Sequence, residues 1–249
     1  MGFTFSHPAL ILPMRYLPRN MYSMNGLIVG SMIPDFEYFI RLDNGSSSSH
    51  TFWGLLFFDL PAALIILTLY HQFMRTSLIN NLPAFLKLRL QAYLHFDWLN
   101  YLKKNWAIVF CSILIGACTH LFWDSFTSGN GYFVTRNPVL ETQLTIFNTP
   151  FYVYKIIKHL SSLIGSIILF ILLIRLPKQH PQHPKSDHSN TYYWLFHTLL
   201  ALIIFLFQIA LYSHSGSLNG LIKKIVSSGL FSILLISIGY KLSAKVVTK

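Results

Sequence analysis

The chain has 249 residues, of which 53% are hydrophobic and only 11% are charged. A soluble domain usually contains about 25% charged residues, so this composition excludes an ordinary soluble protein and indicates an integral membrane protein. The formal net charge of +11 does not indicate nucleic-acid binding, because the basic residues are scattered at the ends of apolar segments, where they anchor membrane helices. We therefore expect membrane lipid, and no nucleic acid, as a partner.

The N-terminal region is mixed and precedes the first long apolar segment. Pro8 can open a short helix that runs to about Tyr16, because proline suits the first turn of a helix. A second apolar stretch, Met24 to Ile33, is too short to cross a bilayer and is expected to form a buried or interfacial helix. Pro34 is expected to end this helix and to place Asp35 in a Pro-Asp turn.

Five later segments are apolar enough, and long enough or nearly so, to cross a membrane, which takes roughly 20 helical residues. The predicted spans are residues 53–70, 106–126, 160–176, 193–213 and 225–240. The predicted fold class is therefore all-α, a polytopic membrane helical bundle of about five transmembrane helices with short N-terminal helices.

Polar connections separate these spans. Residues 71–105 are basic and are expected to include an amphipathic helix around Leu82 to Leu102. Residues 127–158 are rich in Gly, Thr, Asn and aromatic residues. By sequence, we divide the chain into a membrane domain of residues 1–175, a polar linker of residues 176–192 and a C-terminal transmembrane pair of residues 193–249.

Acidic residues are scarce, and several of them stand close to histidine. Only eight Asp and Glu occur in the chain, and three of them lie in or between histidine-containing motifs. The motifs are Ser6-His7-Pro8-Ala9, Gly30-Ser31-Met32-Ile33-Pro34-Asp35-Phe36-Glu37, Ser49-His50-Thr51 and His120-Leu121-Phe122-Trp123-Asp124. Imidazole and carboxylate groups are the ligands that zinc and similar divalent ions accept. Such groups are costly near lipid, so their presence indicates a function.

The predicted topology brings these motifs to one side of the membrane. If the first span crosses the bilayer and the second span returns, His50 at the start of the first lies on the same side as His120 and Asp124 near the end of the second. His7 and Asp35 precede the first span and share that side. The connections on the opposite side carry more Lys and Arg, so the positive-inside tendency weakly predicts a site that faces away from the cytoplasm.

Each motif also has a purely structural explanation. His120 and Asp124 are four residues apart, so on one helix face they can share an ion or form a buried polar pair. Asp35 can cap a turn, and His50 can cap the first span. Because four separate segments supply ligand-type side chains, we favour a divalent metal site with zinc as the expected ion, formed by His7, Asp35, His50, His120 and Asp124.

Three imidazoles and two carboxylates exceed what one tetrahedral zinc needs, so two ions, or one ion with a general base, both remain open. Glu37, two residues beyond Asp35, is the predicted catalytic residue, as a general base or as the partner that orients a histidine. Asp59 is a separate carboxylate inside the first span; it is either protonated or paired with a Ser, His197 or Gln208 of another helix.

Together the motifs resemble an uncharacterised bacterial membrane-protein family, a domain of unknown function. The resemblance extends to about residue 175 and is carried by Phe5 to Ala9, Gly30 to Phe39, Ser49-His50-Thr51 with Gly54, and Gly116 to Thr127. That family is similar in motif layout to the membrane-bound metal-dependent hydrolases and, distantly, to zinc-dependent phospholipase C. The resemblance implies the same five ligand positions, and the expected location is the bacterial inner membrane.

Two functions fit these observations. The first is a metal-dependent hydrolase that acts on phospholipid-like or other phosphoester or ester substrates at the membrane surface. The alternative is a non-catalytic membrane protein whose His/Asp cluster is structural or binds an ion or a partner. A transporter is less supported, because no paired broken helices mark a site at the middle of the membrane.

Overall fold

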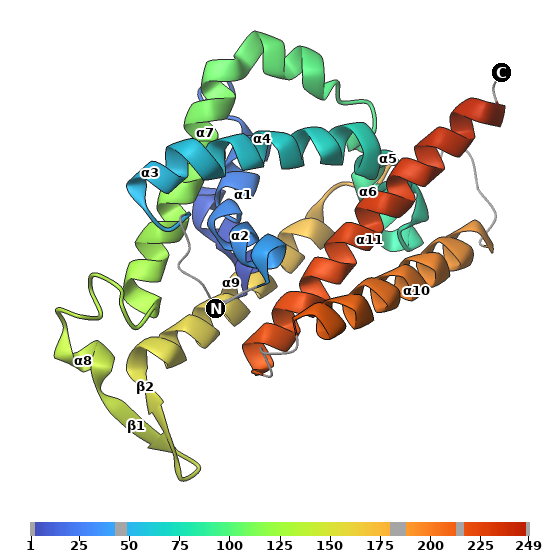
Figure 1. The fold of residues 1–249 in the computed structure, drawn as a ribbon. Coiled ribbons are helices and arrows are strands. Elements are labelled where there is room, and N and C mark those ends of the chain that lie inside the picture. Colours follow the sequence, from blue (N-terminus) through green and yellow to red (C-terminus); the bar gives the residue numbers. More distant parts are fainter. Residues whose placement is uncertain (1–2, 43–48, 180–187, 213–216, 248–249) are drawn as a thin grey trace. The chain divides into compact units, whose positions relative to one another are not determined.

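The computed structural model describes residues 3–42, 49–179, 188–212 and 217–247, and this part of the chain is almost entirely helical (Figure 1). The all-α prediction is confirmed. Contacts divide the chain into two units that alternate along the sequence. Unit 1 comprises Met1–Phe36, Ser48–Leu64 and Asn105–Leu172, and unit 2 comprises Glu37–Ser47, Ile65–Lys104 and Leu173–Lys249. These units are defined by contacts and do not follow the division predicted from the sequence at residues 175 and 192. The division into three sequence segments stays a prediction.

The described chain contains five helices long and apolar enough to span a membrane, as predicted, so the protein is an integral membrane protein. The spanning helices are Phe52–Asn81, Trp98–Thr127, Val153–Arg175, Thr191–Leu211 and Leu218–Ser243. The first two are longer than the apolar runs that predicted them, because the helices continue into polar residues that hydropathy alone does not count.

The first spanning helix alternates between α-helical and π-helical segments. It consists of α3 (Phe52–Gly54), the π-helical η2 (Leu55–Asp59), α4 (Leu60–Leu69), the π-helical η3 (Tyr70–Met74) and α5 (Arg75–Asn81). Thr51 caps its start, because the Thr51 hydroxyl accepts a hydrogen bond of 3.0 Å from the backbone N–H of Gly54. This cap fixes the helix start directly after His50.

In unit 1, helix α1 (Met24–Gly30) lies in direct backbone contact with α7 (Trp98–Thr127). A methyl group on Gly30 would overlap the backbone of Ile113, and a methyl group on Gly116 would lie 2.5 Å from the carbonyl oxygen of Leu27. Gly26 and Gly30 have the Gly-x-x-x-Gly spacing that lets membrane helices approach closely. The contact places the residue after Gly30 beside the second half of α7.

Helix α2 extends from Ile33 to Arg41, where a turn was predicted after Ile33. Pro34 and Asp35 lie in its first turn, so the predicted Pro-Asp turn is wrong. Proline is tolerated in the first turn because its missing N–H would have no partner there, and an aspartate in the first turn is stabilised by the helix dipole.

The N-terminal helix is η1 (Thr4–Tyr16), a 3-10 helix. Its end at Tyr16 is confirmed, whereas its start lies before the predicted Pro8.

A short hairpin lies between α7 and the next spanning helix (Figure 1). The elements are α8 (Pro138–Glu141), β1 (Gln143–Ile146), β2 (Thr149–Tyr152) and α9 (Val153–Arg175). The two strands are antiparallel, and Phe147 and Asn148 form the two-residue turn with φ of 49° and 61°. Positive φ at both positions is typical of a type I′ turn. This hairpin was not predicted from the sequence, because phenylalanine is unfavourable at positive φ.

Unit 2 contains α6 (Ala84–Leu90), η4 (Gln91–Tyr93), α10 (His188–Leu211) and α11 (Leu218–Val247). Helices α10 and α11 lie side by side (Figure 1) and share buried polar contacts. The Ser232 hydroxyl lies 2.6 Å from Nδ1 of His197, and the Gln208 amide donates to Ser227 at 3.2 Å.

The predicted amphipathic helix from Leu82 to Leu102 is wrong, since this stretch is interrupted between η4 and α7. Pro83 lies at its start and separates α5 from α6, because proline has no N–H to continue the helix that precedes it. Before α7, the Asp97 carboxylate accepts a hydrogen bond of 3.2 Å from the backbone N–H of Asn100. An aspartate in this position favours the start of a new helix over continuation of the old one.

Candidate metal centre

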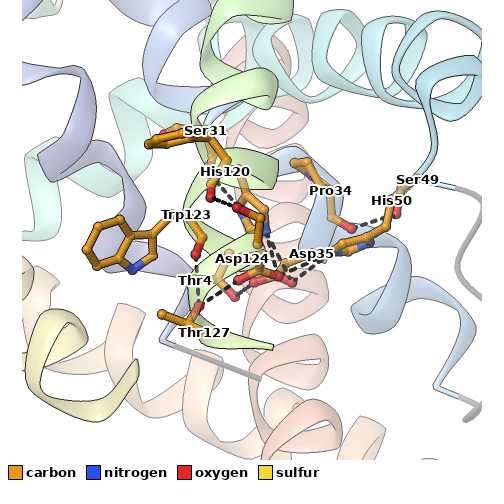
Figure 2. A network of polar contacts seen from close by, with 12 residues as sticks. Thr4, Ser31, Pro34, Asp35, Ser49, His50, His120, Trp123, Asp124 and Thr127 are labelled. Carbon is orange, nitrogen blue, oxygen red and sulfur yellow. Dashed lines mark hydrogen bonds and ion pairs between the residues drawn. The ribbon is translucent and has the colours of Figure 1, made fainter. Parts of the chain in front are cut away.

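The five side chains predicted as metal ligands lie together in unit 1. They come from η1, α2, the short segment before α3 and the second half of α7. Candidate ligand atoms form two groups, His7–Asp35–His120 and His50–His120–Asp124, and within each group the atoms lie within 4.8 Å of one another. Figure 2 shows the rings of His50 and His120 and the carboxylates of Asp35 and Asp124 turned toward one another. Because His120 belongs to both groups, all five side chains form one cluster.

The backbone of Ser31 determines the tautomer of His120. Nδ1 of His120 lies 2.8 Å from the Ser31 carbonyl oxygen, which can only accept, so Nδ1 carries the proton. In the neutral ring, Nε2 then has a free lone pair. Nε2 is fully buried and has no hydrogen-bond partner. A buried imidazole fixed in this way is typical of a metal ligand, whose other nitrogen donates to a carbonyl.

His50 is oriented by a similar arrangement. The Ser49 hydroxyl donates to the Pro34 carbonyl oxygen at 2.7 Å, so its oxygen is left to accept from Nδ1 of His50 at 3.2 Å. Nε2 of His50 then faces the carboxylates, 3.6 Å from Oδ2 of Asp124 and 4.0 Å from Oδ1 of Asp35. Burial by itself would lower the pKa of His50, but the interactions with Asp124 and Asp35 outweigh it and raise the pKa above 6.5.

A threonine hydroxyl contacts one oxygen of each carboxylate. Thr4 donates a buried hydrogen bond of 2.6 Å to Oδ2 of Asp35. The Thr127 hydroxyl lies 3.4 Å from Oδ1 of Asp124 and is also 3.1 Å from the Trp123 carbonyl oxygen, which competes for its proton. The other oxygen of each carboxylate faces His120, with Oδ1 of Asp35 at 3.7 Å and Oδ2 of Asp124 at 3.8 Å from Nε2. The threonines therefore leave one oxygen of each acid directed at the imidazoles.

His7 completes the cluster from the N-terminal 3-10 helix. Its ring stacks on the ring of His120, with centroids 4.0 Å apart and an interplanar angle of 19°. Burial, and after it the neighbouring His120, lowers the pKa of His7 from 6.5 to about 4. The ring is therefore neutral at neutral pH, as a metal ligand must be. Nδ1 of His7 is buried and has no hydrogen-bond partner.

The distances fit atoms that share an ion better than atoms that share a proton. All four nitrogen–oxygen distances between His50 or His120 and the two aspartates are 3.6–4.0 Å, beyond hydrogen-bond range. Two ligands that bind one zinc ion at about 2.1 Å lie about 3.4 Å apart at a tetrahedral angle. The separations are thus only a few tenths of an ångström longer than a metal would require. The donor set, of imidazole and carboxylate, is also one that zinc accepts.

Glu37, the predicted catalytic residue, is not among the grouped ligand side chains found within the described residues. It belongs to unit 2, is 2% exposed, and accepts a hydrogen bond of 2.8 Å from Arg41 one helical turn later. It is two residues from Asp35 on α2, and residues with this spacing point from different faces of a helix. The assignment of Glu37 as general base, or as the partner that orients a histidine, stays a prediction.

Asp59, the carboxylate noted inside the first span, is fully buried in the π-helical segment η2. Its charge is one of the smaller contributions that raise the pKa of His50, after burial and the effects of Asp124 and Asp35. His197 and Gln208, which were considered as partners for Asp59, contact Ser232 and Ser227 of α11.

A cavity of about 300 Å³ adjoins the cluster in unit 1. His7 and Asp124 form part of its wall, so the metal-ligand candidates border a space that a small molecule can enter. Three contacts fix the surrounding wall: the Trp123 indole donates to the Ser161 hydroxyl at 3.2 Å, the Phe3 N–H donates to the Ser162 hydroxyl at 3.2 Å, and Ser161 donates to the Lys158 carbonyl at 3.0 Å.

The carboxylate and imidazole groups of the cluster could be recognised in the sequence, whereas the groups that orient them were missed. The missed orienting groups are Thr4, the Ser31 carbonyl and Thr127, and Lys158 of the cavity wall was missed as well. Thr4 and Thr127 had a detectable signal, because each lies three residues from a predicted ligand and can therefore share its helix face. The Ser31 carbonyl and Lys158 had none, since their roles depend on contacts between distant segments.

Replacing Thr4 with valine is expected to weaken metal binding about 10- to 100-fold, because valine keeps the shape of the side chain but removes the hydrogen bond that orients Asp35. Metal affinity is measured by competition with a chromophoric chelator on detergent-purified protein. Thr145→Val, in the exposed strand β1, is the matched control and should bind metal as the wild type does. Equal affinities for the Thr4 variant and the wild type would contradict an orienting role for Thr4.

Sequence comparison adds a family but no activity. The family described as "Domain of unknown function (DUF4184)" matches residues 1–246. The match therefore extends well beyond residue 175, where the resemblance was predicted to end, and it includes α10 and α11. No curated protein and no solved structure matches the chain.

Proposed function

The chain belongs to the DUF4184 family of domains of unknown function, and from the geometry of its own residues we propose that it is a membrane-bound metal-dependent hydrolase. Its substrates in this proposal are phospholipid-like or other phosphoester or ester molecules at the membrane surface. The observation that carries the proposal is the pair of buried imidazole nitrogens without hydrogen-bond partners, Nε2 of His120 and Nδ1 of His7, beside the carboxylates of Asp35 and Asp124.

A cluster that only holds helices together is a weaker explanation of this geometry. Buried polar groups in such clusters are nearly always satisfied by hydrogen bonds, because an unsatisfied buried group costs about 1–3 kcal/mol. Two nitrogen atoms in this small cluster lack that satisfaction. A cation at the centre would satisfy both nitrogens and both acids.

The residues divide the site into a closed side and an open side. The side chains of His120 and Asp35 are 0% and 5% exposed, whereas those of His50 and Asp124 are 24% and 18% exposed. His120, Asp35 and His7 would thus hold an ion from within the protein, and His50 and Asp124 would hold it where water and substrate arrive. A bound divalent ion such as zinc supplies Lewis-acid chemistry, polarising a phosphoryl or acyl oxygen and lowering the pKa of a water molecule toward neutrality.

The membrane setting is part of the proposal. We place the site at the surface of the bacterial inner membrane, on the face away from the cytoplasm, because Lys and Arg are more frequent in the connections on the opposite side. A substrate with a polar head and an apolar tail would reach such a site from the bilayer itself.

Metal analysis of the full chain, purified in detergent, is the first test. We expect near-stoichiometric zinc or manganese, and we expect a chelator to lower the thermal unfolding temperature, because an ion that binds only the folded state stabilises it. A screen of phosphoester and ester lipids should then detect hydrolysis that the chelator abolishes and added zinc restores.

The proposal would be contradicted if the wild-type protein were purified without metal and its unfolding temperature did not change when zinc or manganese was added. That result would favour the non-catalytic alternative, in which the His/Asp cluster is structural.

A further inference from the structure

The cavity beside the metal cluster has a wall of two kinds. Part of it is polar, with the imidazole of His7, the carboxylate of Asp124 and the ammonium-bearing side chain of Lys158. The remainder is mainly apolar and comes from η1, α7 and α9, with Ala9, Leu10, Trp123, Ile164 and Ile168. A ligand that matches this wall has a charged end and an apolar end.

Lys158 is the cationic group of this wall. It lies on α9 and is partly buried. Within the described residues, the Lys158 ammonium forms no hydrogen bond and no salt bridge, although its carbonyl oxygen accepts from Ser161. Its charge acts on Asp124 and His7 of the same wall only through space, so the ammonium can still form hydrogen bonds with a ligand in the cavity. A lysine at this position favours a ligand with an anionic group, since a desolvated ammonium gains most from a charge partner.

Ser162 supplies a second donor near Lys158. Its hydroxyl oxygen accepts from the Phe3 N–H at 3.2 Å, which leaves the hydroxyl proton to be donated, and no acceptor for that proton is found among the described residues. An ammonium and a hydroxyl on adjacent turns of one helix suit the several oxygens of a phosphoryl group.

The apolar part of the wall exists because η1 lies close to α9. Gly165 has no side chain, and a methyl group there would lie 3.0 Å from the carbonyl oxygen of Ser6. The cavity volume of about 300 Å³ lies at the lower end of the range of roughly 300–1,000 Å³ that is usual for small-molecule pockets. A phosphoryl group and the first few methylenes of one chain would fill this space, whereas two acyl chains would not fit.

On the premise of the proposed function, we infer that the substrate is a phosphoester with a single apolar chain at the phosphoryl end, and that Lys158 is the residue that positions its phosphoryl group beside the metal cluster. The inference selects anionic phosphoesters over neutral carboxylic esters. The rest of the chain would extend from the cavity into the surrounding lipid.

Binding of decylphosphonate, which has no ester bond to hydrolyse, tests this inference without any need for activity. The full chain is studied in dodecyl maltoside micelles by calorimetry, with zinc and after chelation, and empty micelles are subtracted. We expect the Lys158→Gln variant to bind decylphosphonate about 10- to 100-fold more weakly than the wild type, the range for loss of a hydrogen bond to a charged group. Lys158→Arg, which keeps the charge, should retain most of the affinity.

Lys155→Gln is the matched control, because Lys155 lies on the same helix, is exposed, stacks over the Tyr152 ring and does not line the cavity. It should bind decylphosphonate within about twofold of the wild type. Inorganic phosphate and methylphosphonate should bind more weakly than decylphosphonate, because they leave the apolar wall uncovered. Decanol, which lacks the anion, should bind equally to the wild type and Lys158→Gln.

Three results would overturn the inference: equal binding of decylphosphonate to Lys158→Gln and the wild type, equal losses in Lys158→Gln and Lys155→Gln, or phosphate binding as tight as decylphosphonate. The last would assign the cavity to free phosphate. Failure of the proposed function is a separate observation, because it would appear as a wild-type protein without metal. In that case, decylphosphonate binding to metal-free wild type and metal-free Lys158→Gln still tests the role of Lys158.

Discussion

Replacing His120 with asparagine is expected to remove metal from the site while the protein stays folded. The asparagine amide can still donate to the Ser31 carbonyl in place of Nδ1, but it offers no atom at the position of Nε2. We expect metal affinity to fall more than about 100-fold, because a direct ligand is lost and not only a group that orients one. Metal content after purification, measured by mass spectrometry, and hydrolysis by the same sample are the readouts.

His159→Asn is the matched control for this substitution. His159 is an exposed residue of α9 in the same unit and is not part of the metal-ligand cluster. This variant should keep the metal content of the wild type. If the His120→Asn variant kept both its metal and its thermal stability, His120 would not be a metal ligand. The two groups of ligand atoms would then have no ligand in common.

Replacing Gly30 with alanine is expected to lower the free energy of unfolding by about 1–3 kcal/mol, the usual cost of adding volume to a closely packed interface. The added methyl group meets the backbone of Ile113 in α7, which cannot rotate aside as a flexible side chain would. Thermal unfolding in detergent measures the change. Metal affinity should fall as well, because the α1–α7 contact places the Ser31 carbonyl beside His120.

Gly229→Ala provides the comparison, because Gly229 is also a helical glycine, in α11, and a methyl group there has nothing within 4 Å. Alanine is favoured over glycine in a helix by up to about 1 kcal/mol, so this variant should be as stable as the wild type or more stable. Destabilisation of equal size by both variants would show that close packing at Gly30 is not the cause.

The membrane spans could be predicted from sequence because the bilayer sets a simple criterion of length and hydropathy. Their ends could not, since the first spanning helix continues beyond residue 70 to Asn81 through a π-helical turn that no hydropathy pattern indicates. Pro34 was misinterpreted for a related reason. A proline ends one helix or begins the next, and the choice depends on how the chain packs after it.

That the ligand-type side chains lie close together could be predicted from the membrane topology, and less from any single motif. His50 precedes one span and Asp124 lies near the end of the next, so two crossings return the chain to the same side, where the two side chains lie 3.6 Å apart. The orienting groups required tertiary contacts. The Ser31 carbonyl reaches His120 only because glycines let two backbones touch, and no local pattern around Ser31 reports that contact.

The cluster draws its groups from residues 7 to 124, in four separate segments. During synthesis, a ribosome must therefore release both of the first two hydrophobic helices into the bilayer before His120 and Asp124 can join His7, Asp35 and His50. Until then the nascent chain has only the early groups, with no partner for them on α7. On the proposed function, loading with an ion would thus be a late event of biogenesis, after insertion of the second helix, and it would draw on the free ions in the compartment that the finished site faces.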